Sequence, residues 1–183
     1  AVYVATPPDS HRDYVLRVAQ AGKPVYVEKP MARTALECEE MISACDEAGV
    51  GLFVAYYRRA MPRFVTVKEL LDSGRIGQLR SVSIRNERPA PVGEDDDEGW
   101  RVDPDISGGG HFVDLGSHIL DLLDWLLGPV TYAAGIATNR GGRYAAEDLV
   151  TGVFSFSSGV EGVGVWNYDS FQHKDRVEII GTG

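Results

Sequence analysis

The residues best suited to chemistry gather in one stretch, from Gly108 to Asp124, with the sequence GGGHFVDLGSHILDLLD. Its polar side chains recur at steps of three and four, which places them on one stripe of a predicted helix. The other positions are mostly apolar, so we expect a helix buried on most sides whose polar stripe faces a solvated cleft. The polar positions are Asp114, Ser117, His118, Asp121 and Asp124.

Asp114 and His118 are four residues apart, one turn of a regular helix and therefore on the same face. A carboxylate held near an imidazole favours the protonated ring and fixes its orientation. Such a pair can serve as a general acid and base near neutral pH. The alternative from these residues alone is that His118 belongs to a satisfied, buried structural network.

Composition narrows the range of function classes. The chain has 183 residues, 44% hydrophobic and 25% charged, with a formal net charge of −9, which is ordinary for a globular protein. No cluster of Lys and Arg stands out, so we expect neither nucleic acid nor an anionic membrane as a partner. No apolar run reaches the length of a membrane span, and no signal peptide is visible.

The only cysteines, Cys38 and Cys45, are seven residues apart in a predicted helix. At about 1.5 Å of rise per residue they are too far apart for a disulfide, and their spacing matches no zinc motif. We expect core-facing thiols in a reducing cytoplasm.

The first third of the chain alternates short apolar runs with helical patterns and tight turns. Unalternating apolar strands joined by helices predict a parallel sheet with covering helices. The expected elements are a strand in residues 1–8, a helix from a cap at Asp9 or Ser10 to Ala21 with Val15, Leu16, Val18 and Ala19 facing inward, a strand in 24–30, a helix with a Thr34 and Glu37 capping box that ends near Gly49, and a strand in 50–57.

Each predicted strand of this sheet ends in residues that can bind or react. Ligands of such sheets bind outside the carboxyl ends of the strands. We therefore expect one functional edge lined by Thr6-Pro7-Pro8, Glu28-Lys29-Pro30 and Tyr56-Tyr57-Arg58-Arg59.

After residue 57 the pattern changes to antiparallel α+β. The acidic run from Glu94 to Glu98 predicts a mobile, solvated loop tip, and successive strands with tight turns predict antiparallel pairing. We therefore predict two domains, 1–57 and 58–183. The expected elements of the second are a helix in 62–73, an alternating strand in 79–89, a polar loop in 90–107, the polar-striped helix, and strands in 130–138, 148–156, 160–168 and 176–180, with a hairpin turn at Ser157-Ser158-Gly159.

Five motifs occur in order: ATPPDSH, VYVEKP, YYRRAMP, WR and GGGHFVDLGSHILD. Together they resemble the Gfo/Idh/MocA family of NAD(P)-dependent oxidoreductases, which includes glucose–fructose oxidoreductase and inositol dehydrogenase. The resemblance spans nearly the whole chain. It implies the C-terminal half of a Rossmann-type parallel sheet followed by an open-faced, mostly antiparallel substrate domain.

The resemblance implies hydride transfer between NAD or NADP and a secondary alcohol or carbonyl of a sugar, polyol or related small molecule. Lys29 would lie beside the nicotinamide and the substrate hydroxyl, and Asp114 and His118 would complete the catalytic group. The implied cofactor contacts are Thr6, Pro7, His11, Glu28, Lys29, Pro30, Tyr57, Trp100 and Arg101, and the implied substrate contacts are Lys29, Arg101, Asp114 and His118.

The chain departs from the family pattern in places. The phosphate-binding glycine loop is absent from this sequence, so we interpret the chain as an internal fragment that alone would bind cofactor poorly. Tyr57 stands where many relatives carry Asn. The open sheet face commonly serves as a subunit interface in the family, so we expect a homo-oligomer through the strands after residue 129.

Two other functions remain open. In the first, the chain is a metal-dependent hydrolase or isomerase, because His111, Asp114 and His118 offer nitrogen and oxygen ligands for a metal ion. In the second, the chain is a non-catalytic relative of the family.

Single residues have simpler interpretations as well. Lys29 can be a surface lysine, Trp100 a loop anchor and His11 a solvated helix residue. Arg58 and Arg59 can bind an anion or pack against the acidic helix.

Overall fold

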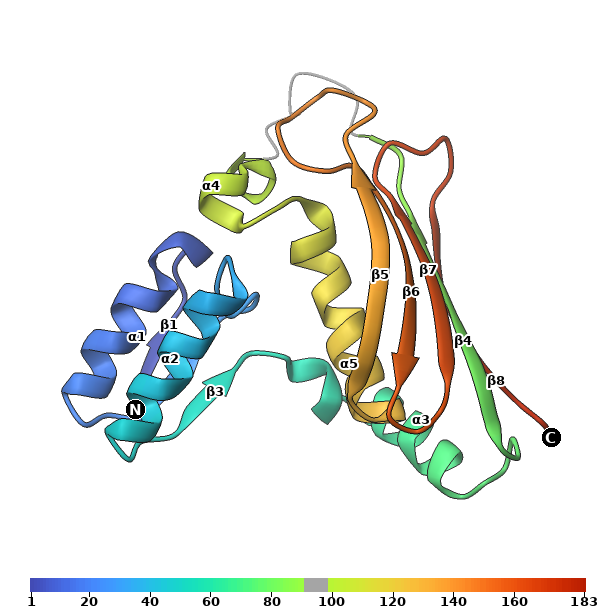
Figure 1. Cartoon of the computed structure of the whole chain (residues 1–183), viewed down its shortest axis with the longest axis horizontal. Coiled ribbons are helices and arrows are strands. Elements are labelled where there is room, and N and C mark those ends of the chain that lie inside the picture. Colours follow the sequence, from blue (N-terminus) through green and yellow to red (C-terminus); the bar gives the residue numbers. More distant parts are fainter. Residues whose placement is uncertain (91–98) are drawn as a thin grey trace. The chain divides into compact units, whose positions relative to one another are not determined.

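The computed structural model describes residues 1–90 and 99–183 in two compact units (Figure 1). Of the described residues, unit 1 comprises 1–56, 99–114 and 144–146, and unit 2 comprises the others from Tyr57 to Gly183. The acidic run from Glu94 to Glu98, predicted to be a solvated tip, lies outside the described residues.

Unit 1 contains the predicted parallel sheet, with strand order β1-β2-β3. Its strands are shorter than the apolar runs predicted, because the residues that follow each strand turn away to form the edge loops. The strands are β1 (Val2–Val4), β2 (Val25–Val27) and β3 (Leu52–Val54), joined by α1 (His11–Gln20) and α2 (Ala35–Glu47).

The core of unit 1 lies between this sheet and the adjacent helices α1 and α2 (Figure 1). Val15, Val25 and Met41 are fully buried, and Leu16 and Val18 pack against the cluster as their helical spacing predicts. The opposite sheet face carries an exposed row of aromatic residues in register, Tyr3, Tyr26 and Phe53.

Both cysteines are free thiols on α2. Cys45 is buried in the core and Cys38 packs against it, as predicted. Burial raises the pKa of each thiol, which makes both of them poor nucleophiles.

Side-chain caps were predicted at the N-termini of both α1 and α2, and only the cap of α2 is present. Thr34 caps α2, since its hydroxyl accepts a hydrogen bond from the Glu37 N–H at 3.2 Å. The predicted side-chain cap of α1 is wrong. A 3-10 turn, Pro8–Ser10, precedes α1, and the Ser10 hydroxyl donates instead to the Pro7 carbonyl and to the Thr6 hydroxyl.

Unit 2 is built on a five-stranded sheet in the order β5-β6-β7-β4-β8. Every pairing is antiparallel except that of β4 with β7, which is parallel and was not predicted; a parallel pair needs a long crossover connection, and β4 and β7 are far enough apart in the sequence to allow one. The strands are β4 (Leu79–Glu87), β5 (Val130–Thr138), β6 (Leu149–Phe156), β7 (Glu161–Asn167) and β8 (Lys174–Gly181), close to the predicted ranges.

The alternation in β4, β6 and β7 buries one face of this sheet. Ile84, Phe154 and Trp166 point into the core, while Val153 and Val163 on the other face are exposed. The helices of this unit are α3 (Pro62–Asp72) and α5 (Ser117–Leu127), preceded by a 3-10 turn at Tyr57–Ala60. Apolar residues of α3, α5 and β8 line a common cavity of about 380 Å³.

The polar-striped segment differs from one regular helix. It begins with the short α4 (Pro104–Ser107), passes through Gly108 in the left-handed conformation, and continues as a π-helical turn, Phe112–Gly116, before α5. The prediction that it is mostly buried is confirmed, since no residue from 111 to 127 is exposed. The assumed spacing of one α-helical turn between Asp114 and His118 does not hold across this joint.

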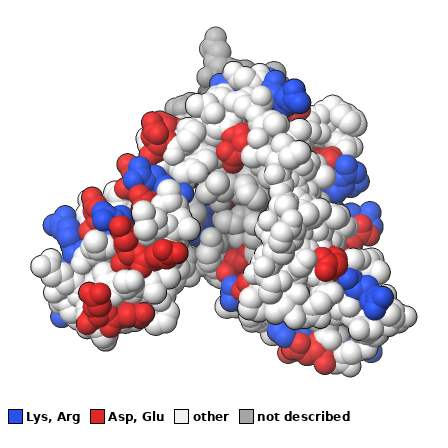
Figure 2. Space-filling view, in the orientation of Figure 1, with Lys and Arg blue, Asp and Glu red and all other residues white. Residues whose placement is uncertain are grey.

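Among residues 1–90 and 99–183, no helix combines the length and the hydropathy needed to cross a bilayer. On the face drawn in Figure 2, Lys and Arg lie singly among Asp and Glu. This scatter agrees with the absence of a basic cluster in the sequence.

Candidate active site

The candidate site in unit 1 lies at the carboxyl ends of β1 and β2. Thr6 and Pro7 follow β1, and Glu28, Lys29 and Pro30 follow β2. The two strands are parallel, so their ends share one edge of the sheet. The Lys29–Pro30 peptide bond is cis.

Lys29 and Asp114 form an ion pair at this edge. The Lys29 ammonium lies 2.5 Å from Asp114 Oδ1 and also donates to the Asp114 carbonyl oxygen at 3.0 Å. The two side chains are only 16% and 14% exposed. An ion pair so little hydrated interacts more strongly than one on the open surface. The geometry therefore confirms that Lys29 is not a free surface lysine.

Arg101 adds a second positive charge on Asp114. Its guanidinium Nε lies 3.9 Å from Asp114 Oδ2 and its side chain is half exposed. The same guanidinium stacks over the Trp100 ring, 4.6 Å from the ring centroid. Both residues belong to a 3-10 turn, Gly99–Val102. The predicted Trp-Arg motif is thus next to the Asp114 carboxylate, and the Arg101 side chain is half exposed.

Glu28 is engaged by the neighbouring strand. The Tyr3 hydroxyl donates to Glu28 Oε1, and this hydrogen bond raises the pKa of Tyr3. The Lys29 backbone N–H donates to the other carboxylate oxygen at 3.1 Å. Glu28 therefore fixes the start of the lysine loop.

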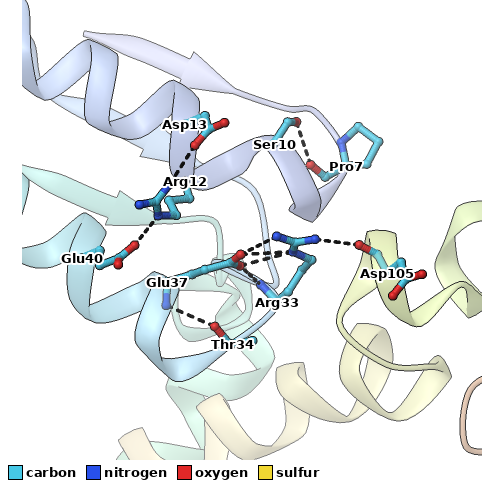
Figure 3. A network of polar contacts seen from close by, with 9 residues as sticks. All are labelled: Pro7, Ser10, Arg12, Asp13, Arg33, Thr34, Glu37, Glu40 and Asp105. Carbon is cyan, nitrogen blue, oxygen red and sulfur yellow. Dashed lines mark hydrogen bonds and ion pairs between the residues drawn. The ribbon is translucent and has the colours of Figure 1, made fainter.

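A polar clasp centred on Arg33 holds the lysine loop to the segment that carries Asp114 (Figure 3). The Arg33 guanidinium bonds the Glu37 carboxylate at 2.6 Å and donates to the Asp105 carbonyl at 2.8 Å. Arg33 also donates its backbone N–H to Glu37 at 3.0 Å. The hydrogen bond from Arg33 lowers the pKa of Glu37.

Sequence reasoning identified Glu37 only as a capping residue and missed Arg33. The available signal was the spacing of four residues between an arginine and a glutamate around a helix start, which is typical of a local ion pair. The long-range bond to Asp105 had no counterpart in the sequence pattern.

Gly108 allows the two segments of unit 1 to approach closely. Its φ is +83°, and an added Cβ would lie 2.6 Å from Arg33 Cα and 2.7 Å from the Arg33 carbonyl oxygen. A side chain at this position would push the α4 segment away from the clasp.

His11 is completely buried, so its alternative interpretation as a solvated helix residue is wrong. Both ring nitrogens face backbone carbonyl oxygens of the loops after β1 and β2. The ring therefore has no exposed surface in this unit for the direct cofactor contact that the resemblance implied.

His118 lies in unit 2, near the start of α5, and is 4% exposed. The Tyr57 ring lies edge-on to it, with centroids 5.4 Å apart. The structure thus brings Lys29, Asp114 and Arg101 together in one unit, and His118 and Tyr57 together in the other.

Arg59 has the packing role that was one of its two interpretations. It binds Asp121 of α5 through several hydrogen bonds of 2.5–3.1 Å, and Asp124 lies 3.7 Å away. This pairing satisfies part of the polar stripe of α5 with protein groups instead of solvent.

Within the described ranges, no three or more side chains of His, Cys, Asp or Glu are grouped closely enough to hold a metal ion. The ring of His111, one of the three ligands of the metal hypothesis, lies edge-on to Tyr144, with centroids 5.8 Å apart.

Comparison with known families places the chain. Residues 1–56 match the oxidoreductase family with an NAD-binding Rossmann fold, and residues 64–183 match the GFO/IDH/MocA C-terminal domain. The chain belongs to the Gfo/Idh/MocA family of oxidoreductases. Its fold is that of the family, part of a Rossmann-type parallel sheet followed by a mostly antiparallel sheet.

Individual relatives agree with this assignment. Oxidoreductase P35 of Formosa agariphila is 37% identical over 99% of this chain and 56% of its own length. Inositol 2-dehydrogenase of Rhizobium meliloti is 29% identical over 100% of the chain and 54% of its own. The crystal structure of the WlbA dehydrogenase of Bordetella pertussis, in complex with NADH and UDP-GlcNAcA, is 32% identical with a TM-score of 0.87, over 98% of this chain and 52% of that one.

The chain thus spans about half the length of these relatives. None of the comparisons supports the metal-dependent hydrolase hypothesis.

The ion pair between Arg33 and Glu37 in the clasp should make the folded chain less stable as the pH falls into the acid range. The pKa of Glu37 is below its ordinary 4.5 in the folded chain, so its contribution is complete above about pH 4.5 and is lost as the pH falls through the folded-state pKa. We expect Glu37→Gln to cost about 1 kcal/mol at neutral pH, and the two proteins to converge in acid.

Thermal unfolding measured from pH 7 to pH 3 tests this dependence. Glu39→Gln, at an exposed position of the same helix, should behave like the wild type throughout. A constant difference between Glu37→Gln and the wild type across the pH range would contradict the assigned cause.

The close approach at Gly108 is tested by Gly108→Ala. We expect it to destabilise unit 1 by about 1–3 kcal/mol more than Gly49→Ala, as measured by urea unfolding. Both glycines have positive φ, but an added Cβ meets nothing within 4 Å at Gly49. Equal effects of the two variants would show that only the backbone conformation matters at Gly108.

Proposed function

We propose that this chain carries the catalytic group of an NAD(P)-dependent dehydrogenase or reductase that acts on the CH–OH group of a sugar, polyol or related small molecule. The observation that supports it best is the shielded Lys29–Asp114 ion pair at the carboxyl edge of the parallel sheet. Relatives named for activity on xylose and inositol support the substrate class.

The residues present fit a nicotinamide at this edge. Thr6 and Pro7 are partly exposed and follow β1 at the sheet edge where Lys29 follows β2, and ligands of parallel sheets bind at such edges. The bound nicotinamide would accept or supply the hydride. The proposed cofactor is NAD or NADP.

The Lys29 ammonium would stabilise the negative charge that develops on the substrate oxygen. Asp114 holds that ammonium in place and, with Arg101 near its other oxygen, can also orient a neighbouring substrate hydroxyl. Preorganised charges of this kind cost no rearrangement during the reaction.

His118 would take the hydroxyl proton in oxidation and return it in reduction. It follows Asp114 by four residues, across the joint between the π-helical turn and α5, and the motif that resembles the family is the support for including it in the catalytic group. Tyr57 would limit the orientations of the ring through their edge contact.

The remaining expectations extend this proposal. We propose that the boundary between the two domains lies between residues 57 and 58. We also propose a cytoplasmic location, which is consistent with two free thiols. The proposed partner is a small-molecule substrate, and neither nucleic acid nor a membrane. Thr6, Pro7, Glu28, Lys29, Pro30, Tyr57, Trp100 and Arg101 stay predicted as the residues of the cofactor side, whereas the buried His11 would not touch the cofactor.

The proposed role of Lys29 is tested by Lys29→Ala in the full-length protein. We expect kcat/KM to fall about 10²- to 10⁴-fold, because the substrate oxygen loses its stabilising charge. Turnover is followed by nicotinamide absorbance in a screen of sugars and polyols with NAD and NADP. Lys23→Ala, an exposed lysine of the same unit, should retain wild-type turnover.

Unchanged turnover of Lys29→Ala would rule out the catalytic role of the ion pair. If the wild-type protein turned over none of the substrates with either NAD or NADP, the hypothesis that the chain is a non-catalytic family relative would be favoured instead.

We also propose that the protein forms a homo-oligomer through the open face of the sheet in unit 2. This face exposes Tyr132, Ile136, Val153 and Val163, and the surface over β5 is uncharged in Figure 2. An apolar face of this kind is unfavourable in water unless a second surface covers it.

Ile136→Asp tests the interface. Ile136 is 68% exposed, and a carboxylate there would be buried without a partner in an oligomer. We expect sedimentation velocity to show dissociation of the full-length protein into monomers. Leu36→Asp, at a 64% exposed position on α2, should leave the assembly intact. An Ile136→Asp protein with the wild-type sedimentation coefficient would exclude this face as the interface.

A further inference from the structure

His11 is the most deeply buried titratable residue next to the candidate site, and the proposed mechanism does not use it. It is the first residue of α1 and is 0% exposed. A polar side chain removed so completely from water is retained only when its polar atoms have partners. Its hydrogen bonds therefore indicate what it does.

The His11 ring connects the two loops that form the site edge. Nε2 lies 2.7 Å from the Thr6 carbonyl oxygen, in the loop after β1. Nδ1 lies 3.2 Å from the Pro30 carbonyl and 3.1 Å from the Met31 carbonyl, in the loop after β2. Pro30 is bonded directly to Lys29, so the ring contacts the backbone that carries the ammonium.

The ring extends the pairing of β1 with β2 beyond the end of the sheet. The Glu28 N–H donates to the Val4 carbonyl at 2.9 Å, which joins the two segments just before Lys29. His11 joins them again just after Lys29. The backbone of Lys29 is therefore held to the β1 loop on both sides.

We propose that His11 is a positioning residue, which fixes Lys29 in register with the Thr6–Pro7 loop so that its ammonium meets Asp114. It acts through the backbone of the lysine loop and touches neither substrate nor cofactor. The importance of this positioning for catalysis rests on the proposed function. The position of the Lys29 side chain itself can be tested without an activity measurement.

The imidazole is well suited to this task. Backbone carbonyls only accept hydrogen bonds, so the bridging side chain must supply donors. The ring donates to both loops at once when each nitrogen carries a proton, and a neutral ring donates to one loop and only contacts the other. The two ring nitrogens are a fixed distance apart and point in different directions, which a flexible amide cannot reproduce. Phenylalanine would fill the same space without a donor, and glutamine would reach one loop but not both.

The accessibility of the Lys29 amine tests the proposal in the full-length protein without cofactor or substrate. The amines are acetylated briefly with an N-hydroxysuccinimide ester, and the modification of each lysine is measured by mass spectrometry. In the wild type, Lys29 should react more slowly than the exposed Lys23, because Asp114 holds it.

We expect His11→Phe to raise the labelling of Lys29 about three- to tenfold, the factor that corresponds to one lost buried hydrogen bond. The labelling of Lys23 should not change. His11→Gln should restore part of the protection, because its amide can still donate to one loop. Val15→Ala, at a fully buried position of the same helix, removes core packing and should leave Lys29 protected.

A folded His11→Phe protein with unchanged Lys29 labelling would overturn the proposal. So would an equal rise at Lys23, or the same rise in Val15→Ala, since both would indicate general loosening of the unit. If neither His11 variant folds while Val15→Ala does, His11 is a determinant of folding and the positioning role is rejected. The proposed function fails in a different experiment. Lys29→Ala would then keep its turnover, while the labelling of Lys29 would still depend on His11.

Discussion

The ion pair between Lys29 and Asp114 is the interaction on which the organisation of the candidate site depends. Its two members are 85 residues apart in the sequence, and each carries a charge that is mostly shielded from water. A shielded charge is stable only with a partner of opposite sign. The pair therefore requires that the segment around residues 98–114 belongs to the first compact unit, although the preceding strand β4 belongs to the second.

Three other features of unit 1 support this pair by fixing the backbone on either side of it. Arg33 ties the lysine loop to the Asp105 carbonyl, Gly108 allows those segments to touch, and His11 binds the lysine loop to the end of β1. All three act on backbone groups, whose positions are harder to shift than those of flexible side chains. The role proposed for the Lys29 ammonium needs this precision, because electrostatic stabilisation of a transition state depends on charges that are already in place.

In the second unit, the helix α5 is mostly buried although it carries four polar residues of the stripe. Arg59 binds Asp121 and lies near Asp124, which neutralises the C-terminal half of the stripe, while His118 at the other end lies against Tyr57. One face of the sheet is covered through Ile84, Phe154 and Trp166. The other face leaves apolar residues of β5, β6 and β7 exposed, which is the basis for proposing an oligomer.

Local sequence patterns were enough to predict the order of the elements, the parallel first sheet, the mostly antiparallel second sheet and the buried helix, and the motifs singled out Lys29 and Asp114, which the fold brings together. These features follow from local periodicity and from short motifs, which the chain carries regardless of its tertiary contacts. Only the tertiary structure decided that His11 is buried between two loops, that Arg33 reaches Asp105, and that a π-helical turn interrupts the regular spacing between Asp114 and His118. Each of these depends on contacts between residues distant in the sequence or on a local departure from regular helix geometry, neither of which hydrophobic periodicity encodes.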